Sequence, residues 1–318
     1  MVRLMIIKLG YVSLSKTLDI TPSSTMTYTN YEKENYPLEK LINITKNNLE
    51  ALKNIMIYNI KNNIHFYRLT SKLVPLATHD KVNFDYIKLV SKECTKISKL
   101  INDNNIRVDT HPDQYAVLNS TDNKIVKNTF EILEYHYKIL TALEIKNPII
   151  LLHVGSSACG KKASITRFIN NFNKLPNNIK KCIAVENDDK VYNAVDTLNL
   201  CKKLKIPMVL DYHHYICNNT GEKLEQYIED IIATWNKQEP KFHFSSPKSK
   251  LKKEFRSHHD YINSDEFIKF LNILKPYNNT YYIMLEAKAK DDALFRLVRE
   301  LKYKTDYKFI DDTTFIVS

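Results

Sequence analysis

Metal-competent side chains stand at the ends of six consecutive short apolar runs in this chain. IRVDT is followed by His111, PIILL by His153, KCIAV by Glu186, PMVL by Asp211, PKF by His243 and YYIML by Glu286. Imidazole nitrogens combined with carboxylate oxygens suit Zn²⁺ or Mn²⁺, and a set of this size suits more than one ion. Ions of this kind support hydrolysis, because a bound divalent cation lowers the pKa of water.

Each of these residues, taken singly, also has a purely structural interpretation. A histidine at a strand end is often a hydrogen-bonded part of the fold, and a glutamate there often forms a salt bridge in a loop. Several acidic groups brought to one place are costly, however, unless a cation balances their charge. We therefore predict a metal cluster from the joint pattern.

The residues that would carry this cluster lie in an alternating series of elements. Eight short apolar runs are expected to be strands: residues 4–12, 65–70, 106–110, 148–154, 181–187, 207–214, 240–246 and 281–288. Longer segments with helical spacing follow them: 38–63, 84–105, 124–145, 163–175, 191–205, 222–236, 264–275 and 291–303. Nearly continuous apolar strands favour a parallel sheet covered by helices, and eight β–α repeats are the number in a closed TIM barrel. An open doubly wound sheet is the alternative.

A closed barrel would bring all of these strand ends to one mouth, where the active sites of such barrels lie. No shift in composition marks a domain boundary, so residues 1–303 are predicted to form a single barrel domain. Residues 304–318 form a tail of strand-like composition to which we assign no role.

The net charge and the glycine content of the chain narrow the class of protein. The formal net charge is +11, from 47 Lys and Arg against 36 Asp and Glu, which favours a polyanionic partner, although a basic pI is common in soluble proteins. Only four glycines are present, and no phosphate-cradling loop of the GxGxxG or GxxxxGK type occurs, so we expect no nucleotide cofactor.

Cellular context is also suggested by the sequence. No run approaches the eighteen apolar residues of a membrane span. The five cysteines are an odd number without a CxxC pair, which fits reduced thiols in a cytoplasmic protein. The start MVRLMIIKLGYV is interpreted as a first strand rather than a signal peptide.

Further polar residues are expected at the same mouth. His79 follows the second strand, and His258 and His259 follow the seventh. Lys241 lies two residues before His243 and so faces the same way, and Tyr11 closes the first strand. Ordinary packing or a solvated loop is the alternative for His79, Lys241 and Tyr11.

Two loops at this mouth have compositions that suit DNA. Gln114 and Tyr115 in HPDQYAVLNS place an amide beside an aromatic ring, and such a pair can probe a base stack or simply form a turn. The stretch KSKLKKEFR (248–256) adds positive charge where a phosphate backbone would need it, or is a solvated loop.

At the level of motifs, the chain resembles the UV damage endonucleases. The resemblance rests on LGYV, RLTSKLVPLATH, HPDQYAVLNS, LLHVG, VENDDKVY, VLDYHH, KFHFSSPKS, FRSHHDYI and LEAKAKDDAL, which run through most of the sequence. Two positions depart from the pattern: Asp113 stands where Gly is usual in HPGQ, and His259 stands where a small residue is usual.

The resemblance implies a barrel like that of endonuclease IV with two or three divalent ions, expected to be Mn²⁺. By motif, the implied metal ligands are His111, His153, Glu186, Asp211, His214, His243, His258 and Glu286. His79, Lys241 and Tyr11 match active-site residues, and Lys241 is a candidate for carboxyl modification. Gln114 and Tyr115 match the residues that enter the duplex at the lesion.

The resulting hypothesis is hydrolysis of the phosphodiester immediately 5′ of a UV photoproduct in double-stranded DNA, leaving a 3′-hydroxyl and a 5′-phosphate. The expected location is cytoplasmic, in association with the nucleoid. The alternatives are an abasic-site endonuclease of the endonuclease IV type, a sugar isomerase of the xylose isomerase type, and a non-catalytic barrel that binds DNA or metal.

Overall fold

Eight parallel strands form the centre of the computed structural model, which describes residues 4–317. Their bounds are β1 Met5–Val12, β2 Phe66–Leu69, β3 Arg107–Thr110, β4 Ile150–His153, β5 Ile183–Glu186, β6 Met208–Asp211, β7 Lys241–Phe244 and β8 Thr280–Leu285. Each strand pairs with the next in order, and β1 pairs with both β8 and β2, so the sheet closes into a barrel. The predicted TIM barrel is confirmed, and the open sheet is excluded.

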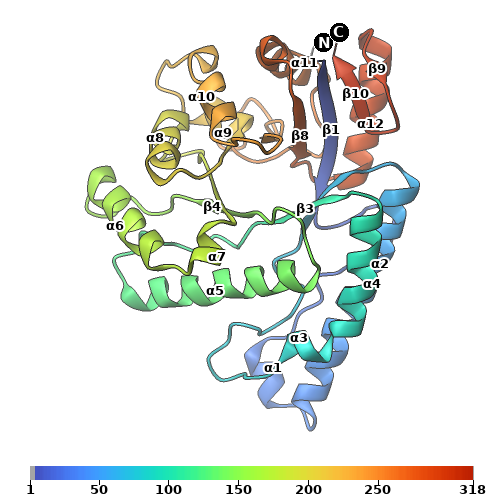
Figure 1. Ribbon diagram of the computed structural model, residues 1–318, viewed down its shortest axis with the longest axis vertical. Helices are drawn as coiled ribbons and strands as arrows, with labels where there is room; N and C mark the ends of the chain where they lie inside the picture. The colour runs from blue at the N-terminus through green and yellow to red at the C-terminus, as the bar shows by residue number, and fades with distance from the viewer. Residues whose placement is uncertain (1–3, 318) are drawn as a thin grey trace.

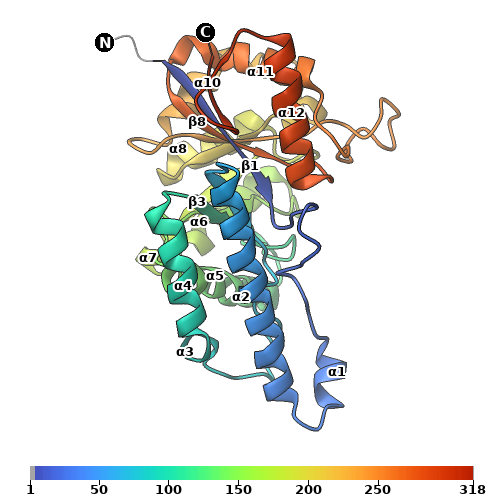
Figure 2. The same cartoon turned by 90° about the vertical axis from the view of Figure 1, so that its right-hand side faces the viewer.

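The helices surround the barrel. The main ones are α2 Pro37–Lys61, α4 Ser91–Asp103, α5 Asn123–Ala142, α6 Lys161–Lys174, α8 Ala194–Leu204, α10 Ile228–Ala233, α11 Ser264–Leu274 and α12 Lys290–Lys304. Shorter segments are α1 Tyr28–Glu32, α3 Tyr86–Leu89, α7 Asn177–Lys180 and α9 Tyr212–Cys217, with single turns at Leu224–Gln226 and Lys275–Tyr277. Figure 2 shows the long α2 beside α4, extending beyond the barrel toward α1.

Alternation along the strands separates two apolar regions. The large core between strands and helices contains Ile7 and Leu9 of β1 with much of the helical apolar surface. The barrel interior holds smaller clusters, one with Ile149, Leu151, Ala184, Val209 and Trp235 and another with Phe66, Tyr282 and Met284. Because side chains two residues apart share a face, His153, Glu186, Asp211 and Glu286 stand above these inner clusters.

The helix predicted over 84–105 is divided at Val90 into α3 and α4, and two further predicted elements differ from the structure. The run 207–214 is a strand only to Asp211, because the Asp211 side chain caps α9 by accepting a hydrogen bond from the His214 N–H at 2.7 Å. The predicted helix 222–236 is divided into a 3₁₀ turn, Leu224–Gln226, and α10. Both differences shorten an element without moving its neighbours.

The tail adds two strands to the sheet, on the edge of β1 that faces away from β8. β9 (Lys308–Phe309) and β10 (Thr314–Val317) form an antiparallel pair, and β10 pairs with Met5–Lys8 of β1. Figure 1 shows β10 and β9 beside β1, near both chain ends. Residues 1–3 and 318, which belong to the predicted barrel domain and tail, lie outside the described residues.

Candidate metal centre and active site

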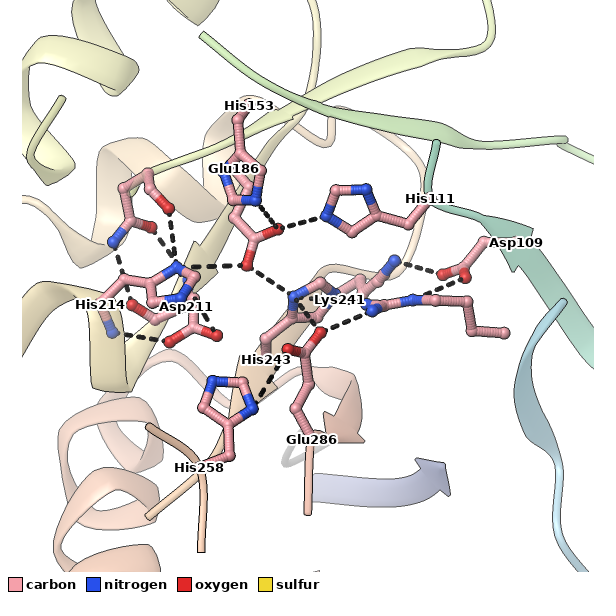
Figure 3. A network of polar contacts seen from close by, with 12 residues as sticks. Asp109, His111, His153, Glu186, Asp211, His214, Lys241, His243, His258 and Glu286 are labelled. Carbon is pink, nitrogen blue, oxygen red and sulfur yellow. Dashed lines mark hydrogen bonds and ion pairs between the residues drawn. The ribbon is translucent and has the colours of Figure 1, made fainter. Parts of the chain in front are cut away.

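Glu186, the last residue of β5, lies at the centre of the histidines and carboxylates in the barrel mouth (Figure 3). Its Oε2 is 3.2 Å from Nε2 of His111 and 3.8 Å from Nε2 of His153. Its Oε1 accepts a hydrogen bond of 2.7 Å from Nδ1 of His243. The register places His153 beside Glu186 and Asp211 beside His243, so these side chains leave the barrel at matching heights.

Two groups of side chains are arranged as metal ligands. One contains His111, His153 and Glu186, and the other contains Glu186, Asp211, His243 and Glu286, with the ligand atoms of each group within 4.8 Å of one another. Glu186 belongs to both groups. A carboxylate shared in this way can bridge two ions.

Asn187 locks the end of β5 to the end of β6. Its side chain accepts from the Asp211 N–H at 2.9 Å and donates to the Asp211 carbonyl at 3.0 Å. Its own carbonyl lies 3.0 Å from Nδ1 of His214. Since a carbonyl can only accept, the Nδ1 proton of His214 points at it, and this contact fixes the orientation of the ring. The same nitrogen lies 3.7 Å from Glu186 Oε1 and 3.9 Å from Asp211 Oδ2, and His214 belongs to neither of the two ligand groups described above.

Glu286 connects the cluster to β2. Its Oε1 accepts a hydrogen bond of 2.6 Å from Arg68 and lies 3.2 Å from Nδ1 of His243, while its Oε2 is 3.9 Å from Nδ1 of His258. His259 does not take this place, since its Nδ1 accepts from the Tyr261 N–H at 2.9 Å. The structure therefore places His258, rather than His259, beside the cluster.

A buried layer of charge lies beneath the ligands. Lys241 forms an ion pair with Asp109, and the Arg68 guanidinium lies 3.6 Å from the same carboxylate. Lys241 is fully buried and lies over the ring of Phe66 in the barrel interior. As predicted, Lys241 shares the strand face of His243, which contacts Arg68 directly.

The surroundings of the cluster raise the pKa of some of its side chains and lower the pKa of others. Burial alone raises the pKa of Glu186, but its interactions with the surrounding imidazoles of His243, His153 and His111 outweigh burial and bring this pKa well below its usual value. Burial raises the pKa of Asp211 to about 6, opposed by His214. Burial also lowers the pKa of His243 to about 4, so this imidazole is neutral at physiological pH.

Several atoms at the centre are suited to a cation. Asp211 Oδ2 is buried without a hydrogen bond, and Glu186 Oε2 is buried without a well-directed one, although a ring nitrogen of His111 lies near it. Nδ1 of His111 faces the Pro112 carbonyl at 3.1 Å, so Nε2 carries an electron pair that points at a carboxylate oxygen. Two acceptors facing each other at 3.2 Å are stabilised by an ion that both of them bind. The residues therefore fit divalent metal ions.

Two predicted active-site residues, Tyr11 and His79, have their contacts outside the two ligand groups. The Tyr11 ring is fully buried between β1 and α2, where its hydroxyl donates to Asn59 at 2.8 Å and its ring packs edge-on against Tyr67. Tyr11 is in register with Leu285, which faces the outer core, so its side chain points away from the barrel interior. The His79 ring stacks on Tyr28 of α1, and its Nδ1 accepts from the Lys81 N–H.

Gln114 and Tyr115 lie in the exposed loop after β3. Tyr115 is 68% exposed, and Gln114 is also exposed. Asp113, the departure from the family pattern, accepts a hydrogen bond of 2.9 Å from Ser71. Its carboxylate thus ties this loop to the loop after β2, which a glycine at this position would not do.

Sequence reasoning missed Arg68, Asp109 and Asn187. Arg68 is a buried cation inside the second apolar run, and Asp109 lies two residues before His111 on the same strand face. A charge within an apolar strand at the spacing of a predicted ligand is a usable signal of an inward-facing polar group. No comparable signal distinguishes Asn187 from an ordinary loop asparagine.

Comparisons with known proteins identify the family of the chain. The family model described as UV-endonuclease UvdE matches residues 7–314. The UV DNA damage endonuclease of Bacillus cereus (strain 03BB102) is 43% identical over 317 residues, covering 98% of this chain and 99% of that protein. The corresponding enzyme of Bacillus mycoides (strain KBAB4) is 44% identical over the same length.

Solved structures give the same result for the fold. The crystal structure of SacUVDE has a TM-score of 0.84 and 34% sequence identity, covering 93% of this chain and 98% of that one. Endonuclease IV from Thermus thermophilus has a TM-score of 0.56 at 12% identity, covering 80% of this chain and 95% of that one, and shows a shared barrel fold alone. Together with the family model over nearly the whole chain, these relatives show that the chain belongs to the UV-endonuclease UvdE family and is a nuclease that acts on damaged DNA.

Proposed function

We propose that this nuclease hydrolyses the phosphodiester immediately 5′ of UV photoproducts, both cyclobutane dimers and 6-4 photoproducts, in duplex DNA. The products would be a 3′-hydroxyl and a 5′-phosphate. The observation that carries the proposal is the sharing of Glu186 between two groups of ligands, within a chain of the UV-endonuclease family. Hydrolysis of a phosphodiester is the chemistry for which paired ions are suited.

The residues that would hold two or three divalent ions, with Mn²⁺ as our choice, are His111, His153, Glu186, Asp211, His214, His243, His258 and Glu286. Bound ions would supply an activated water and would offset negative charge on the phosphate. The chain supplies the orientation of these ligands: the Pro112 and Asn187 carbonyls fix the rings of His111 and His214 through Nδ1, and Arg68 holds Glu286.

Lys241 remains in the proposal as a buried cation beneath the cluster. Burial lowers its pKa to about 8, with Asp109 opposing the shift, so this amine loses its proton more readily than an exposed lysine. Tyr11 and His79 are left out of the reacting site, since their hydrogen bonds and ring contacts lie elsewhere.

Lesion selection is assigned to the loop that carries Gln114 and Tyr115. A photoproduct weakens base stacking, so the cost of kinking and opening the duplex is lower at the lesion than in intact DNA. An exposed aromatic ring and amide can occupy the space that the displaced bases leave. The exposure of both side chains supports this role.

The test is to incubate the purified protein and Mn²⁺ with three duplexes, carrying a cyclobutane dimer, an abasic site or no lesion. We expect one cut, immediately 5′ of the dimer, with a 3′-end that a polymerase extends. Cutting of the abasic duplex alone would support the endonuclease IV type of activity instead. We also propose a cytoplasmic location, which the free thiols support.

A further inference from the structure

The loop that follows β7 is a closed and internally braced structure. Pro247 and His258 form a β-bridge at its base, next to the metal ligands, and the Lys248 N–H donates to the Ser257 carbonyl at 2.6 Å. We refer to residues 247–258 as the β7 loop. Its two ends are therefore held together where it leaves the mouth.

Contacts within the β7 loop give it a defined shape. Glu254 accepts hydrogen bonds from Lys248 and from the Ser249 hydroxyl. The Leu251 carbonyl accepts from the N–H groups of Glu254 and Phe255, each at 2.9 Å. The Phe255 ring packs 5.9 Å from that of His213, which is fully buried. A lysine-rich loop that is only solvated has no need of this bracing.

The bracing leaves three lysines free. Within residues 4–317, Lys248 pairs with Glu254, whereas Lys250, Lys252 and Lys253 form no ion pair. These three line a hollow of about 760 Å³ between the β7 loop and the loop after β5, together with Lys190 and Arg256. Asp189 is the one acidic residue in this lining, and it lies 3.7 Å from Arg256.

The order of the strands places the β7 loop opposite Tyr115. Around the closed barrel, β3 and β7 are four strands apart in either direction. A duplex laid over the cluster would therefore meet the β3 loop on one side and the β7 loop on the other. Each loop carries an exposed apolar residue at its tip, since Tyr115 and Leu251 are both 68% exposed.

We propose that the β7 loop is a second DNA-binding element, which grips backbone phosphates across the mouth from Gln114 and Tyr115. Lys250, Lys252 and Lys253 bind the phosphates in the hollow, and Leu251 lies against the edge of the groove between them. Lysines flanking an apolar tip suit this contact, because the charges hold the backbone while the tip packs against sugars and bases. This inference rests on the proposed function, which supplies the substrate, UV-damaged duplex DNA. It adds that the DNA is held on the side of the mouth where the β7 loop lies.

The first experiment measures binding of a dimer-containing duplex as a function of salt, without Mn²⁺ so that no cutting occurs. The variant is Lys250→Gln with Lys252→Gln, and the matched control is Lys146→Gln with Lys237→Gln, two exposed lysines at the other end of the barrel. At roughly 0.9 per phosphate contact, we expect the slope of log K against log salt to fall by about 2 in the variant. The control should keep the wild-type slope, and equal slopes in all three proteins would overturn the proposal.

The second experiment maps the position of the β7 loop on DNA. A photocrosslinking amino acid is placed at residue 251 in one protein and at residue 115 in another, and the crosslinked nucleotides are identified on the same duplex. We expect the two sets of crosslinks to lie on opposite sides of the cut. Crosslinks from both positions on one side would contradict the proposed grip.

These measurements separate the two proposals. If the wild type binds the duplex with the expected slope and crosslinks but never cuts it, the proposed function fails while the β7 loop keeps its role. If the wild type cuts 5′ of the dimer and the lysine variant keeps the full slope, the inference fails and the proposed function stands.

Discussion

Arg68 Nη1 lies 2.6 Å from Oε1 of Glu286, and this ion pair joins the end of β2 to the end of β8 across β1. The guanidinium also contacts Nε2 of His243 and lies near Asp109. The pair is buried, with the Arg68 side chain 6% exposed. Arg68 therefore sets the position of one candidate ligand and is adjacent to a second.

Replacing Arg68 should destabilise the folded protein. Arg68→Met would leave Glu286 and Asp109 without this cation, and breaking a buried pair on one side costs roughly 3–5 kcal/mol. Arg68→Lys should recover part of this loss, because it keeps the charge but not the fork of donors. Urea unfolding in the presence of a chelator measures both variants, and an unchanged free energy of unfolding in Arg68→Met would contradict the assignment.

Glu186→Gln should abolish incision and weaken Mn²⁺ binding by more than the roughly 10–100-fold typical of residues that only support a ligand. The reason is that Glu186 belongs to both ligand groups. Calorimetric titration with Mn²⁺ measures the affinity, and His79→Ala is the control, since His79 stacks on Tyr28. Loss of Mn²⁺ binding in His79→Ala would place that histidine at the centre after all.

Tyr11→Phe should affect stability and leave catalysis intact. The change removes the donor to Asn59 Oδ1, a buried acceptor, and a buried group left without its partner costs about 1–3 kcal/mol. Incision per folded molecule should equal that of the wild type. If incision is lost while the unfolding curve stays unchanged, Tyr11 has the catalytic role that its motif suggests.

Asp291→Ala should release the loop after β1. The buried Asp291 carboxylate accepts from Ser15 Oγ at 2.7 Å, from the Lys16 N–H at 2.6 Å and from Tyr58 at 3.0 Å. Because charged acceptors make the stronger hydrogen bonds, we expect a loss of roughly 3 kcal/mol. Denaturant unfolding measures it, and Asp291→Asn should lose less. Equal losses in both variants would show that packing, not the carboxylate, holds this loop.

His136 should make the protein less stable in mild acid. Burial, with a smaller contribution from His111, lowers its pKa to about 3 from an ordinary value of 6.5. Below pH 6.5 the unfolded chain binds a proton at this residue and the folded chain does not, so stability falls by about 1.4 kcal/mol per pH unit, or about 2 kcal/mol by pH 5. Above pH 6.5 this contribution is constant.

The comparison that isolates His136 is the change in unfolding free energy between pH 7.5 and pH 5 in the wild type and in His136→Gln, both with chelator. The variant should lose about 2 kcal/mol less over this interval. An identical change in the two proteins would show that other groups account for the acid sensitivity.

Much of the fold follows from periodicity. The eight apolar runs match the eight barrel strands because buried parallel strands need apolar residues on both faces. The run 207–214 suggests one continuous strand because Tyr212 continues its apolar character. The cap that Asp211 forms on α9 depends on a side-chain hydrogen bond, which hydrophobicity does not reveal.

The candidate site is predictable in outline, since its ligands follow strands that share one mouth. The contacts within the buried layer of Arg68, Asp109 and Lys241 are not predictable, because these residues meet only after the sheet closes and brings β2, β3 and β7 together. The orientation of the Tyr11 side chain is also hard to predict from the sequence. Its orientation depends on the register of β1 with β2 and β8, which no local pattern encodes.

The pairing of β10 with β1 has a consequence for how the chain is made. Met5 and Val317 are partners in the sheet although more than 300 residues separate them, and β8 joins β1 only from Thr280 onward. During synthesis β1 leaves the ribosome long before β8 and β10, so these neighbours are absent while the chain between them is made. Contacts of such long sequence separation slow folding, and unpaired strand edges invite aggregation. We expect chaperones that shield strand edges to increase the yield of newly made protein.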